Sequence, residues 1–487
     1  MEGFPALHVD RSAGKPLHRQ IYDNFRAAII RGEIVAGRRI PSSRSFALEL
    51  GISRLPVLNA YAQLLAEGYF ESRVGAGTFV STTLPEGLNP GPPPVDQAIR
   101  LGSGPRPISR RALRLPDLVT GPWTGKWGAF GVHQPALDHF PVRIWSNLVL
   151  RHSRNPEPRV WHDLNSLGSL RFREAICAYL RTSRAVRCDP AQIMVVSGSQ
   201  QALDITARVL FDEGSPVWME DPGYRLVRNA LIGAGCRLIP VPVDREGLNV
   251  TAGIKLCRRA RAAYVTPSHQ YPLGSTMSAS RRFQLLNWAQ SVGAWIIEDD
   301  YDSEYRFESM PVASLQGLDQ NSRVIYIGTF SKVVFPSLRV GYIVIPPDLV
   351  DRFTAVRRIM DIFPSYLFQE TLADFLLEGH FARHIRRTRL LYKDRRTALV
   401  ESIQDQFGDM LEVQGEKAGM HLAVTLPKGY DDNEVAMQAA KKGLWVTPIS
   451  PNYLSDKKRH GLVLGFGSTP ADQISEKVSV LRKLFRF

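Results

Sequence analysis

The sequence predicts two domains of different fold: a small N-terminal α+β domain of the winged helix-turn-helix type, and a larger α/β domain with a mostly parallel sheet. The chain has 487 residues, which is too long for one ordinary hydrophobic core. Its first part combines short amphipathic helical patterns with a glycine-containing hairpin pattern. From about residue 126 onward, apolar β-rich runs alternate with helical runs instead. These two patterns require two separate cores.

Three helices are predicted in the first domain. Apolar residues at helical spacing mark the first helix within residues 17–29, and SSRSFALELG is a short second helix ended by Gly51. Ser53 is the expected N-cap of the third helix, and Pro56 falls in its first turn, where a missing N–H costs little. The apolar stripe expected on this third helix consists of Val57, Ala60, Tyr61, Leu64 and Leu65.

A β-hairpin wing is expected directly after the third helix. Two β-rich pieces flank Gly75-Ala76-Gly77 in the stretch FESRVGAGTFVS. Helix, tight turn, helix and wing in this order are typical of a DNA-binding domain that places the start of its third helix in the major groove. The alternative interpretation is a small helical cap with a hairpin and no role in nucleic-acid binding.

The stretch RIPSSRSFALELGISRLPVLNAYAQLLAEGYFESRVGAGTFV resembles the DNA-binding domain of GntR-type bacterial transcription regulators, and the resemblance runs from about Leu17 to Val80. It implies that double-stranded DNA is contacted by Arg44, Ser53, Arg54 and Gly75. Many members carry a small polar pair after the arginine that starts the third helix, where this chain has Leu55-Pro56. Readout at these two positions would therefore be apolar or made through the backbone.

Composition limits the classes of partner and compartment. The formal net charge of +14 suits an anionic partner such as nucleic acid, although a basic enzyme would also fit. No apolar run approaches the length of a bilayer span and the N-terminus lacks an apolar signal core, so we expect a cytoplasmic chain with no membrane partner. The four cysteines show no metal-ligand spacing, and no metal site is expected.

The domain boundaries follow from a shift in composition. Residues 81–125 are rich in proline and glycine, contain several arginines and show little periodicity, as a flexible linker would. The expected organisation is therefore a DNA-binding domain at 1–80, a linker at 81–125 and an effector domain at 126–487.

Six β-rich runs mark the sheet of the large domain: IMVVSG, SPVWME, CRLIPVPV, AAYVTP, AWIIEDD and VIYIGTF. Ligands of parallel α/β sheets gather at the carboxyl ends of the strands, so the chemistry should be sought there. One strand end runs from Ser197 straight into a helix, whose first N–H groups could hold an anion. Another ends in Ser331-Lys332, with Arg339 seven residues further on.

A third strand end is rich in carboxylates, from Glu298 to Glu304. It could be a solvated loop or a metal site, but no histidine lies close to it in sequence, which disfavours a transition metal. The three strand ends together fit pyridoxal 5′-phosphate (PLP). This cofactor needs an amine for its aldehyde, a carboxylate for its pyridine nitrogen and an anion cradle for its phosphate.

The blocks SGSQQAL, DPGY, TPSHQYPLG, IIEDDYDSEY and GTFSKVVFPSLRVGY resemble, in the same order, signature blocks of the fold-type I PLP-dependent aminotransferases, from about Trp127 to the C-terminus. The resemblance implies that Lys332 is the catalytic residue and forms the internal aldimine. Asp299 would pair with the pyridine nitrogen, Tyr301 would contact the phenolic oxygen, and Tyr224 would lie over the ring. The implied phosphate site consists of Ser199, Gln200, Ser331 and Arg339.

Two departures from the aminotransferase pattern concern the ligand side of the site. Aminotransferases usually carry Asn-Pro before a glycine, where this chain has Tyr271-Pro272. Many also carry an arginine that binds the substrate carboxylate in a strand like residues 462–466, which holds none here. Arg225 and Arg228 are alternative partners for the carboxylate of an effector, although each could equally be a surface residue.

The two resemblances together cover nearly the whole chain, and their combination resembles the MocR/GabR-type regulators. This implies a PLP-dependent transcription regulator that senses a small amine or amino acid, or PLP itself. It also implies a homodimer in which each DNA-binding head lies across the partner.

Two other interpretations stay open at this point. The first is an active aminotransferase with an accessory DNA-binding head, and partial aminotransferase chemistry would fit a regulator as well. The second is a cofactor-free DNA-binding protein with a relic domain, which is disfavoured because both Lys332 and Asp299 are present.

Overall fold

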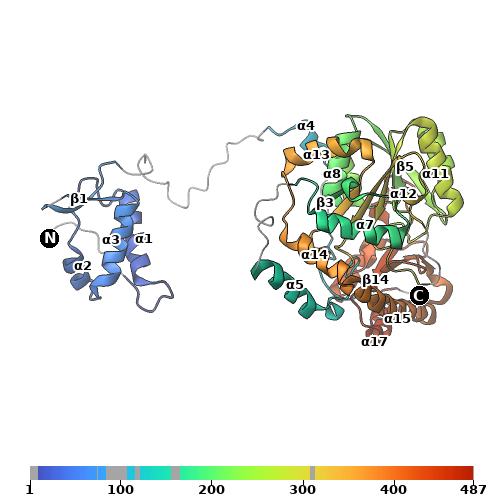
Figure 1. Ribbon diagram of the computed structural model, residues 1–487. Coiled ribbons are helices and arrows are strands. Elements are labelled where there is room, and N and C mark those ends of the chain that lie inside the picture. The colour runs from blue at the N-terminus through green and yellow to red at the C-terminus, as the bar shows by residue number, and fades with distance from the viewer. Residues whose placement is uncertain are drawn as a thin grey trace. The chain divides into compact units, whose positions relative to one another are not determined.

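The computed structural model describes residues 9–73, 75–83, 107–115, 121–154, 165–307 and 313–485. The chain divides into two compact units, Met1–Pro107 and Ile108–Phe487 (Figure 1). Most of the expected linker at 81–125 lies outside the described residues. Its described part from residue 108 onward belongs to the second unit, contains the short helix α4 (Arg110–Leu113) and pairs with that unit through Arg114 and Glu213.

The first unit contains the predicted helices and wing. Its elements are α1 (Leu17–Ile30), α2 (Ser43–Glu49), α3 (Arg54–Ala66), β1 (Phe70–Arg73) and β2 (Gly77–Val80). Phe25 of α1 is fully buried at its centre and meets Tyr61 and Phe70 edge-on, at ring-centroid distances of 5.6 and 5.4 Å. The antiparallel β1–β2 hairpin pairs Phe70 with Val80. The prediction of a winged helix-turn-helix domain is confirmed.

One member of the stripe predicted on α3 was wrong. Val57, Ala60, Tyr61 and Leu64 are buried, whereas Leu65 is 37% exposed. Neighbouring residues point about 100° apart around a helix, so Leu65 lies past the edge of the face that packs on the core. The sequence pattern could not reveal this, because α3 is apolar on both faces.

The second unit is built on an eight-stranded sheet with the order β3-β10-β9-β8-β7-β4-β5-β6. Its strands are β3 (Ile193–Val196), β4 (Pro216–Asp221), β5 (Arg237–Asp244), β6 (Gly247–Leu248), β7 (Ala262–Val265), β8 (Trp295–Asp300), β9 (Val324–Thr329) and β10 (Gly341–Val344). The strands from β5 through β4, β7 and β8 to β9 run parallel, and β10 is antiparallel between β3 and β9. The predicted α/β fold with a mostly parallel sheet is confirmed, although β10 was not predicted as a strand.

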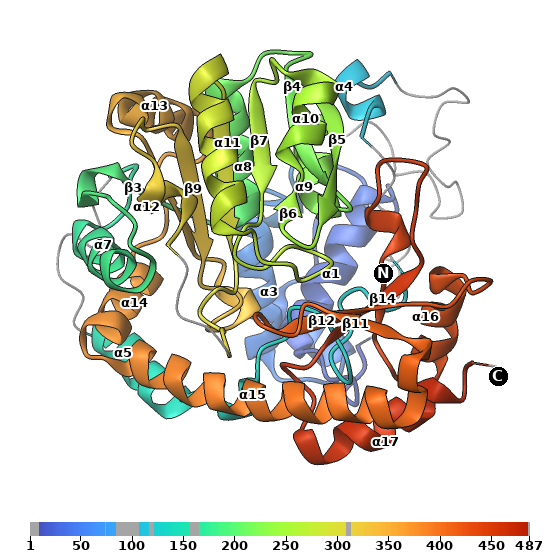
Figure 2. The same ribbon diagram turned by 90° about the vertical axis from the view of Figure 1, so that its right-hand side faces the viewer.

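Helices cover both faces of this sheet (Figure 2). The helices of the unit after α4 are α5 (Val142–Arg154), α7 (Leu170–Arg184), α8 (Ser199–Leu210), α9 (Arg225–Gly233), α10 (Val250–Cys257), α11 (Ala279–Val292), α12 (Leu315–Leu318), α13 (Val350–Met360), α14 (Leu367–Leu377), α15 (His380–Phe407), α16 (Asp432–Lys441) and α17 (Ala471–Arg482). Successive residues of β3 enter different cores, because strand side chains alternate between faces. Val195 packs with residues of α7 and α14, and Val196 packs with residues of α8 and α13.

A second, four-stranded antiparallel sheet lies toward the C-terminus. Its order is β11 (Glu412–Gln414), β12 (His421–Thr425), β14 (Gly461–Gly465), β13 (Thr447–Pro448). Figure 2 shows the long helix α15 running along one side of this sheet, with α17 beside it. Among the described residues, no helix combines the length and the apolar character that a membrane span requires.

Short 3-10 helices connect several of these elements. They are η1 (Leu137–His139), η2 (Pro190–Gln192), η3 (Pro336–Leu338), η4 (Pro347–Leu349), η5 (Gly408–Met410) and η6 (Ser450–Asn452). Of these, η3 matters for the site, because it carries the chain from Lys332 back to the start of β10.

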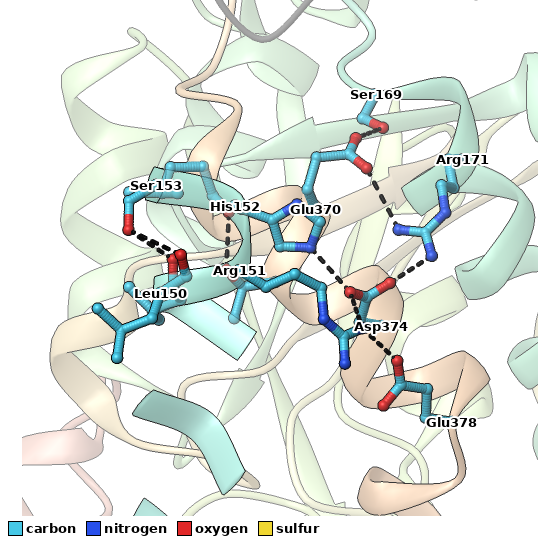
Figure 3. A network of polar contacts seen from close by, with 12 residues as sticks. Leu150, Arg151, His152, Ser153, Ser169, Arg171, Glu370, Asp374 and Glu378 are labelled. Atoms are coloured by element: carbon cyan, nitrogen blue, oxygen red, sulfur yellow. Dashed lines mark hydrogen bonds and ion pairs between the residues drawn. The ribbon is translucent and has the colours of Figure 1, made fainter. Parts of the chain in front are cut away.

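A polar network joins α5, α7 and α14 (Figure 3). Its centre is Asp374, whose side chain is only 4% exposed. Arg151 Nη1 and His152 Nε2 both lie 2.8 Å from Asp374 Oδ2, and Arg171 donates to Oδ1. Burial opposes ionisation of this carboxyl, but the hydrogen bonds from Arg171 and His152 outweigh burial and lower its pKa. The network therefore depends on Asp374 being charged.

We predict that Asp374→Asn destabilises the second unit by about 2 kcal/mol, because two arginines lose their shared buried carboxylate. A lowered pKa in the folded protein stabilises it above the unfolded pKa of about 3.9, and this stabilisation is lost as pH falls through the folded value. The difference in urea midpoint between wild type and variant should therefore shrink below about pH 4. Glu378→Gln, at the more exposed end of the network, is the matched control and should cost much less. Equal stability of wild type and Asp374→Asn at neutral pH would contradict the role given to Asp374.

Candidate functional site

A cavity lies at the carboxyl ends of the parallel strands, where the sequence placed the chemistry. Its lining contains every residue expected to bind the cofactor: Ser199, Gln200, Tyr224, Asp299, Tyr301, Ser331, Lys332 and Arg339. These residues lie at the end of β8, just after β3, β4, β8 or β9, or just before β10. Segments separated by more than a hundred residues in sequence therefore meet because the strands that carry them are neighbours in one sheet.

Lys332 follows the end of β9 and lines the cavity. Burial lowers the pKa of its amine to about 8, even though the charges of Asp302 and Asp299 act in the opposite direction. A primary amine with such a pKa is partly unprotonated near neutral pH, and it can therefore attack a carbonyl carbon. The cavity thus holds a nucleophilic amine.

Asp299 is the last but one residue of β8, and its carboxyl group faces the same cavity. The phenol of Tyr264 on β7 donates a hydrogen bond of 2.7 Å to Asp299 Oδ2. Burial raises the pKa of Asp299 to about 6, while that hydrogen bond and the charge of Lys332 lower it. The second oxygen, Oδ1, is buried and has no hydrogen-bond partner among the described residues. It is oriented for a donor supplied by a ligand.

An anion-binding end is formed where α8 and η3 approach each other. Gly198, with φ of +111°, is the N-cap of α8, and a Cβ placed on it would lie 3.1 Å from Nη2 of Arg339. The guanidinium therefore lies against the first turn of α8, whose N–H groups also attract anions. Gln200 Nε2 and Ser331 Oγ are buried there without a hydrogen-bond partner in the described part of the chain. Unused donors, a guanidinium and a helix N-terminus suit a phosphate group.

The ring-side residues are positioned by aromatic contacts. Tyr224 caps the start of α9 and meets Tyr271 at a centroid distance of 5.2 Å. Burial raises the pKa of Tyr224 to about 12, so it stays a neutral phenol. Tyr301 donates a hydrogen bond of 2.8 Å to the carbonyl of His269. His133 lies between these rings, 5.1 Å from Tyr271 and 5.6 Å from Tyr301 by centroid.

The acidic run that ends β8 and continues to Glu304 is not a solvated loop. Glu298 accepts hydrogen bonds from the backbone N–H groups of Leu315 and Gln316, both 2.9 Å long. Asp300 accepts a 2.6 Å hydrogen bond from Tyr326. Each carboxylate has its own partner, and only Asp299 among them lines the cofactor cavity.

Asp302 has a histidine neighbour that is distant in sequence. His269 Nδ1 lies 3.0 Å from Asp302 Oδ2, both side chains are almost fully buried, and the His421 ring packs at a tilt against His269 with a centroid distance of 4.4 Å. A Cβ at Gly419 would lie 2.0 Å from the His269 ring, so this packing requires glycine there. No histidine lies near the acidic run in the sequence, but the fold brings His269 against Asp302. His269, Asp302 and His421 could offer ligand atoms to a metal. The expectation of no metal site stays a prediction.

Several cavity residues were missed by the sequence analysis. Tyr264, Thr266 and Thr329 line the cavity at or just after strand ends, and His133 and Tyr271 come from loops. Tyr271 had been noted only as a departure from the aminotransferase pattern. The strand-end rule could have found Tyr264, since it lies on β7 directly beside β8. No local signal points to His133.

A second cavity adjoins the first and shares the lining residues His133, Tyr224, Leu226, Tyr271 and Lys332 with it. Its further lining includes three tryptophans and several polar residues: Trp123, Trp127, Trp445, Lys126, Asn229 and Asn452. This arrangement provides space for a ligand that reaches Lys332.

The two candidate effector arginines are placed differently. Arg225 lines the second cavity, whereas Arg228 lines neither cavity. The Nη1 atom of Arg228 lies 3.3 Å from the carbonyl of Tyr453 and 3.5 Å from that of Pro451, so this side chain supports the backbone around η6.

The residues expected to contact DNA are all exposed on the first unit. Ser53 is the N-cap residue of α3, and its hydroxyl makes no capping hydrogen bond. Arg54 Nε donates a 3.0 Å hydrogen bond to Ser43 Oγ, which brings the first turns of α2 and α3 together near the exposed Arg44. Gly75 lies at the tip of the wing with φ of +76° and open space around it.

Comparison with known proteins identifies both units. Residues 17–80 match the family described as bacterial regulatory proteins, gntR family, and residues 163–461 match aminotransferase class I and II. The chain is 39% identical to the probable rhizopine catabolism regulatory protein MocR of Rhizobium meliloti, over 98% of this chain and 96% of that protein. It is 32% identical to the pyridoxine biosynthesis transcriptional regulator PdxR of Corynebacterium glutamicum, over 95% and 96% of the two chains.

Solved structures resemble the second unit. A kynurenine aminotransferase of Pyrococcus horikoshii superposes with a TM-score of 0.71 at 26% identity, covering 77% of this chain and 96% of that one. An archaeal alanine:glyoxylate aminotransferase shares the fold, with a TM-score of 0.72 at 24% identity over 78% and 98% of the chains. The expected fold-type I aminotransferase architecture is confirmed. Aminotransferases of class I and II depend on PLP.

We predict that Lys332 in cofactor-free protein reacts with acetic anhydride with a pH midpoint near its pKa of about 8. An ordinary exposed lysine titrates near about 10.4. Asp299→Asn should lower the midpoint further, because the Asp299 charge raises the pKa of the amine. Peptide mass spectrometry of samples labelled across a pH series measures both midpoints, with the exposed Lys255 in the same samples as reference. A midpoint for Lys332 at or above that of Lys255 would contradict the description of a buried, activated amine.

Proposed function

The chain belongs to the MocR-type regulators, in which a gntR-family domain precedes an aminotransferase class I and II domain, and from this premise we propose that it is a PLP-dependent regulator of transcription. One observation supports the proposal more than any other. A half-buried amine, a carboxylate oxygen without a partner among the described residues and an anion-binding helix end line one cavity. The same chain carries a winged helix-turn-helix unit.

The cavity residues fit PLP in their chemistry. When bound, the cofactor supplies an aldehyde that condenses reversibly with primary amines and a ring that withdraws electrons. Lys332 would hold the aldehyde carbon, and Asp299 Oδ1, which lacks a partner in the described chain, would accept the pyridinium N–H. Tyr301 would contact the phenolic oxygen and Tyr224 would cover the ring.

The phosphate would lie against the N-terminus of α8. Gln200 and Ser331 would donate hydrogen bonds with atoms that have no other partner in the described residues, and Arg339 would supply the countercharge. Ser199 would contribute from the first turn of the helix.

The first unit would bind double-stranded DNA through the start of α3 and through the wing. A single head offers few contacts, so we propose a homodimer in which two heads read two half-sites and each head lies across the partner. Phosphate contacts make such binding fall steeply with salt concentration. Contacts to DNA phosphates would account for Arg44 and Arg54, the exposed arginines in the first turns of α2 and α3.

The effector would be a small amine or amino acid that enters through the second cavity and reaches Lys332. Arg225 is the candidate partner for an effector carboxylate, and its place in that cavity favours it over Arg228. An effector changes DNA binding only if it binds the DNA-competent state and the DNA-incompetent state of the protein with different affinity. PLP itself could be the signal by the same reasoning, since its presence or absence also changes the cavity.

An active aminotransferase with an accessory DNA-binding head is the second candidate function. The activated amine of Lys332 supports it, because such an amine can accept and return a proton at its Nζ atom near neutral pH. Sustained conversion of a keto acid over many turnovers would favour the enzyme, whereas a single incomplete exchange would favour the regulator. Partial chemistry of this kind is compatible with our proposal.

We predict that borohydride reduction of PLP-treated protein places a pyridoxyl group on Lys332. Lys332→Ala should lose the label and the yellow colour of the bound cofactor. Among the described lysines, Lys332 alone lines the first cavity, where Asp299 and Arg339 also lie. Lys255→Ala, which changes an exposed lysine on α10, is the matched control and should be labelled normally. Peptide mass spectrometry locates the label. Absence of label in the wild type, or a label elsewhere, would refute the cofactor half of the proposal.

We predict that Arg54→Ala weakens specific DNA binding by about tenfold or more, since a base or phosphate contact is worth roughly 1–3 kcal/mol. The full-length protein would first select its operator from a random duplex pool, and binding would then be measured by fluorescence anisotropy at several salt concentrations. Arg208→Ala, an exposed arginine on α8 paired with Asp204, is the control and should bind as wild type. Unchanged affinity of Arg54→Ala would remove α3 from the proposed interface.

A further inference from the structure

Helix α3 carries leucines on its solvent side as well as apolar residues on its core side. Leu55 is 64% exposed and Leu58 is 40% exposed, and they are three residues apart on one face. Val57, Ala60 and Tyr61 occupy the opposite, buried face. Two leucines side by side on the solvent face of a helix, next to the exposed Asn59, form a small apolar patch that a partner could cover.

The start of α3 offers few hydrogen-bonding groups for reading a base. Pro56 lacks an N–H and Leu55 has no polar side-chain atom. Ser53 and Arg54 are the only residues at the start of the helix whose side chains could donate there. Apart from the backbone, Leu55 and Pro56 can therefore contact bases only through apolar atoms.

The charges around the exposed leucines indicate what covers them. Arg54 adjoins Leu55 in the chain, and the exposed Arg44 lies beside the same end of the helix, where Arg54 Nε bonds Ser43 Oγ at 3.0 Å. No acidic residue occurs between Glu49 and Glu67. A partner that is anionic at its edges and apolar at its floor matches this surface. The major groove of DNA has phosphates along its edges, and the 5-methyl groups of thymine are the apolar groups on its floor.

We propose that Leu55 and Leu58 read the 5-methyl groups of two thymines in each half-site of the operator. The inference rests on the proposed DNA binding and adds its sequence specificity. Side chains three residues apart on a helix are about 5–6 Å apart, and stacked bases are about 3.4 Å apart. The two thymines therefore lie within about two base steps of each other, next to the position contacted by Arg54.

The test removes one methyl group at a time from the DNA. The full-length protein selects its operator from a random duplex pool, and each thymine of a half-site is then replaced by deoxyuridine, which lacks only the 5-methyl group. Loss of a contacted methyl should weaken wild-type binding about fourfold. Leu55→Ala and Leu58→Ala should each weaken binding and make one of the two positions insensitive to the replacement.

The control is Leu48→Ala, which removes the side chain of a leucine that is 86% exposed on α2. It should keep both the wild-type affinity and the wild-type sensitivity to deoxyuridine. The replaced leucines are exposed, so the variants should fold, and circular dichroism would check this.

Three results would overturn the inference in distinguishable ways. If no thymine in the operator is sensitive to loss of its methyl group, DNA binding stands and the apolar readout fails. If Leu55→Ala and Leu58→Ala change the oligomeric state but leave the deoxyuridine pattern intact, the leucines contact protein instead. If the wild-type protein selects no DNA sequence at all, the proposed function itself fails and takes this inference with it.

Discussion

Burial of a primary amine and a carboxylate at one edge of the sheet is the constraint on which the site depends. Lys332 and Asp299 have pKa values displaced toward each other, to about 8 and about 6, and in both cases burial is the largest cause. Two buried charges of opposite sign are tolerated when they interact and when further partners are present. Tyr264 supplies one such partner for Asp299, and the remaining oxygen is left for a ligand. The fold thus maintains a reactive amine that is paired electrostatically and still accessible from a second cavity.

The same constraint explains how one domain could serve as a sensor. An amine that can exchange its covalent partner is sensitive to whichever primary amine enters the cavity, and this holds whether or not turnover follows. A separate unit with an exposed, arginine-flanked recognition helix supplies the output. Because the two units have separate cores, each can be altered by mutation without unfolding the other. The residues proposed to detect a ligand and the surface proposed to read DNA therefore belong to different units.

Local sequence patterns predicted the elements better than the contacts between them. The six β-rich runs and the three head helices could be predicted, because strands and amphipathic helices have characteristic apolar periods. The strand ends, together with the resemblance to aminotransferases, located the eight expected cofactor residues, all of which line one cavity. Contacts that join distant segments had no such signal: the pairing of β10 with β3, and the approach of His269 to Asp302, are set only by the folded sheet. The exposure of Leu65 was missed for a related reason, since a helix that is apolar on both faces does not reveal which face is buried.

The most direct test of the central claim is the affinity of the PLP-loaded protein for its selected operator, measured with and without amines that alter the spectrum of the bound cofactor. The account predicts that at least one such amine changes the affinity several-fold in the wild type. It also predicts that the same amine has no effect in Lys332→Ala, which still carries an intact DNA-binding unit. Operator affinity that is indifferent to every amine and to PLP, together with sustained formation of keto acid, would contradict the account and identify the protein as an enzyme.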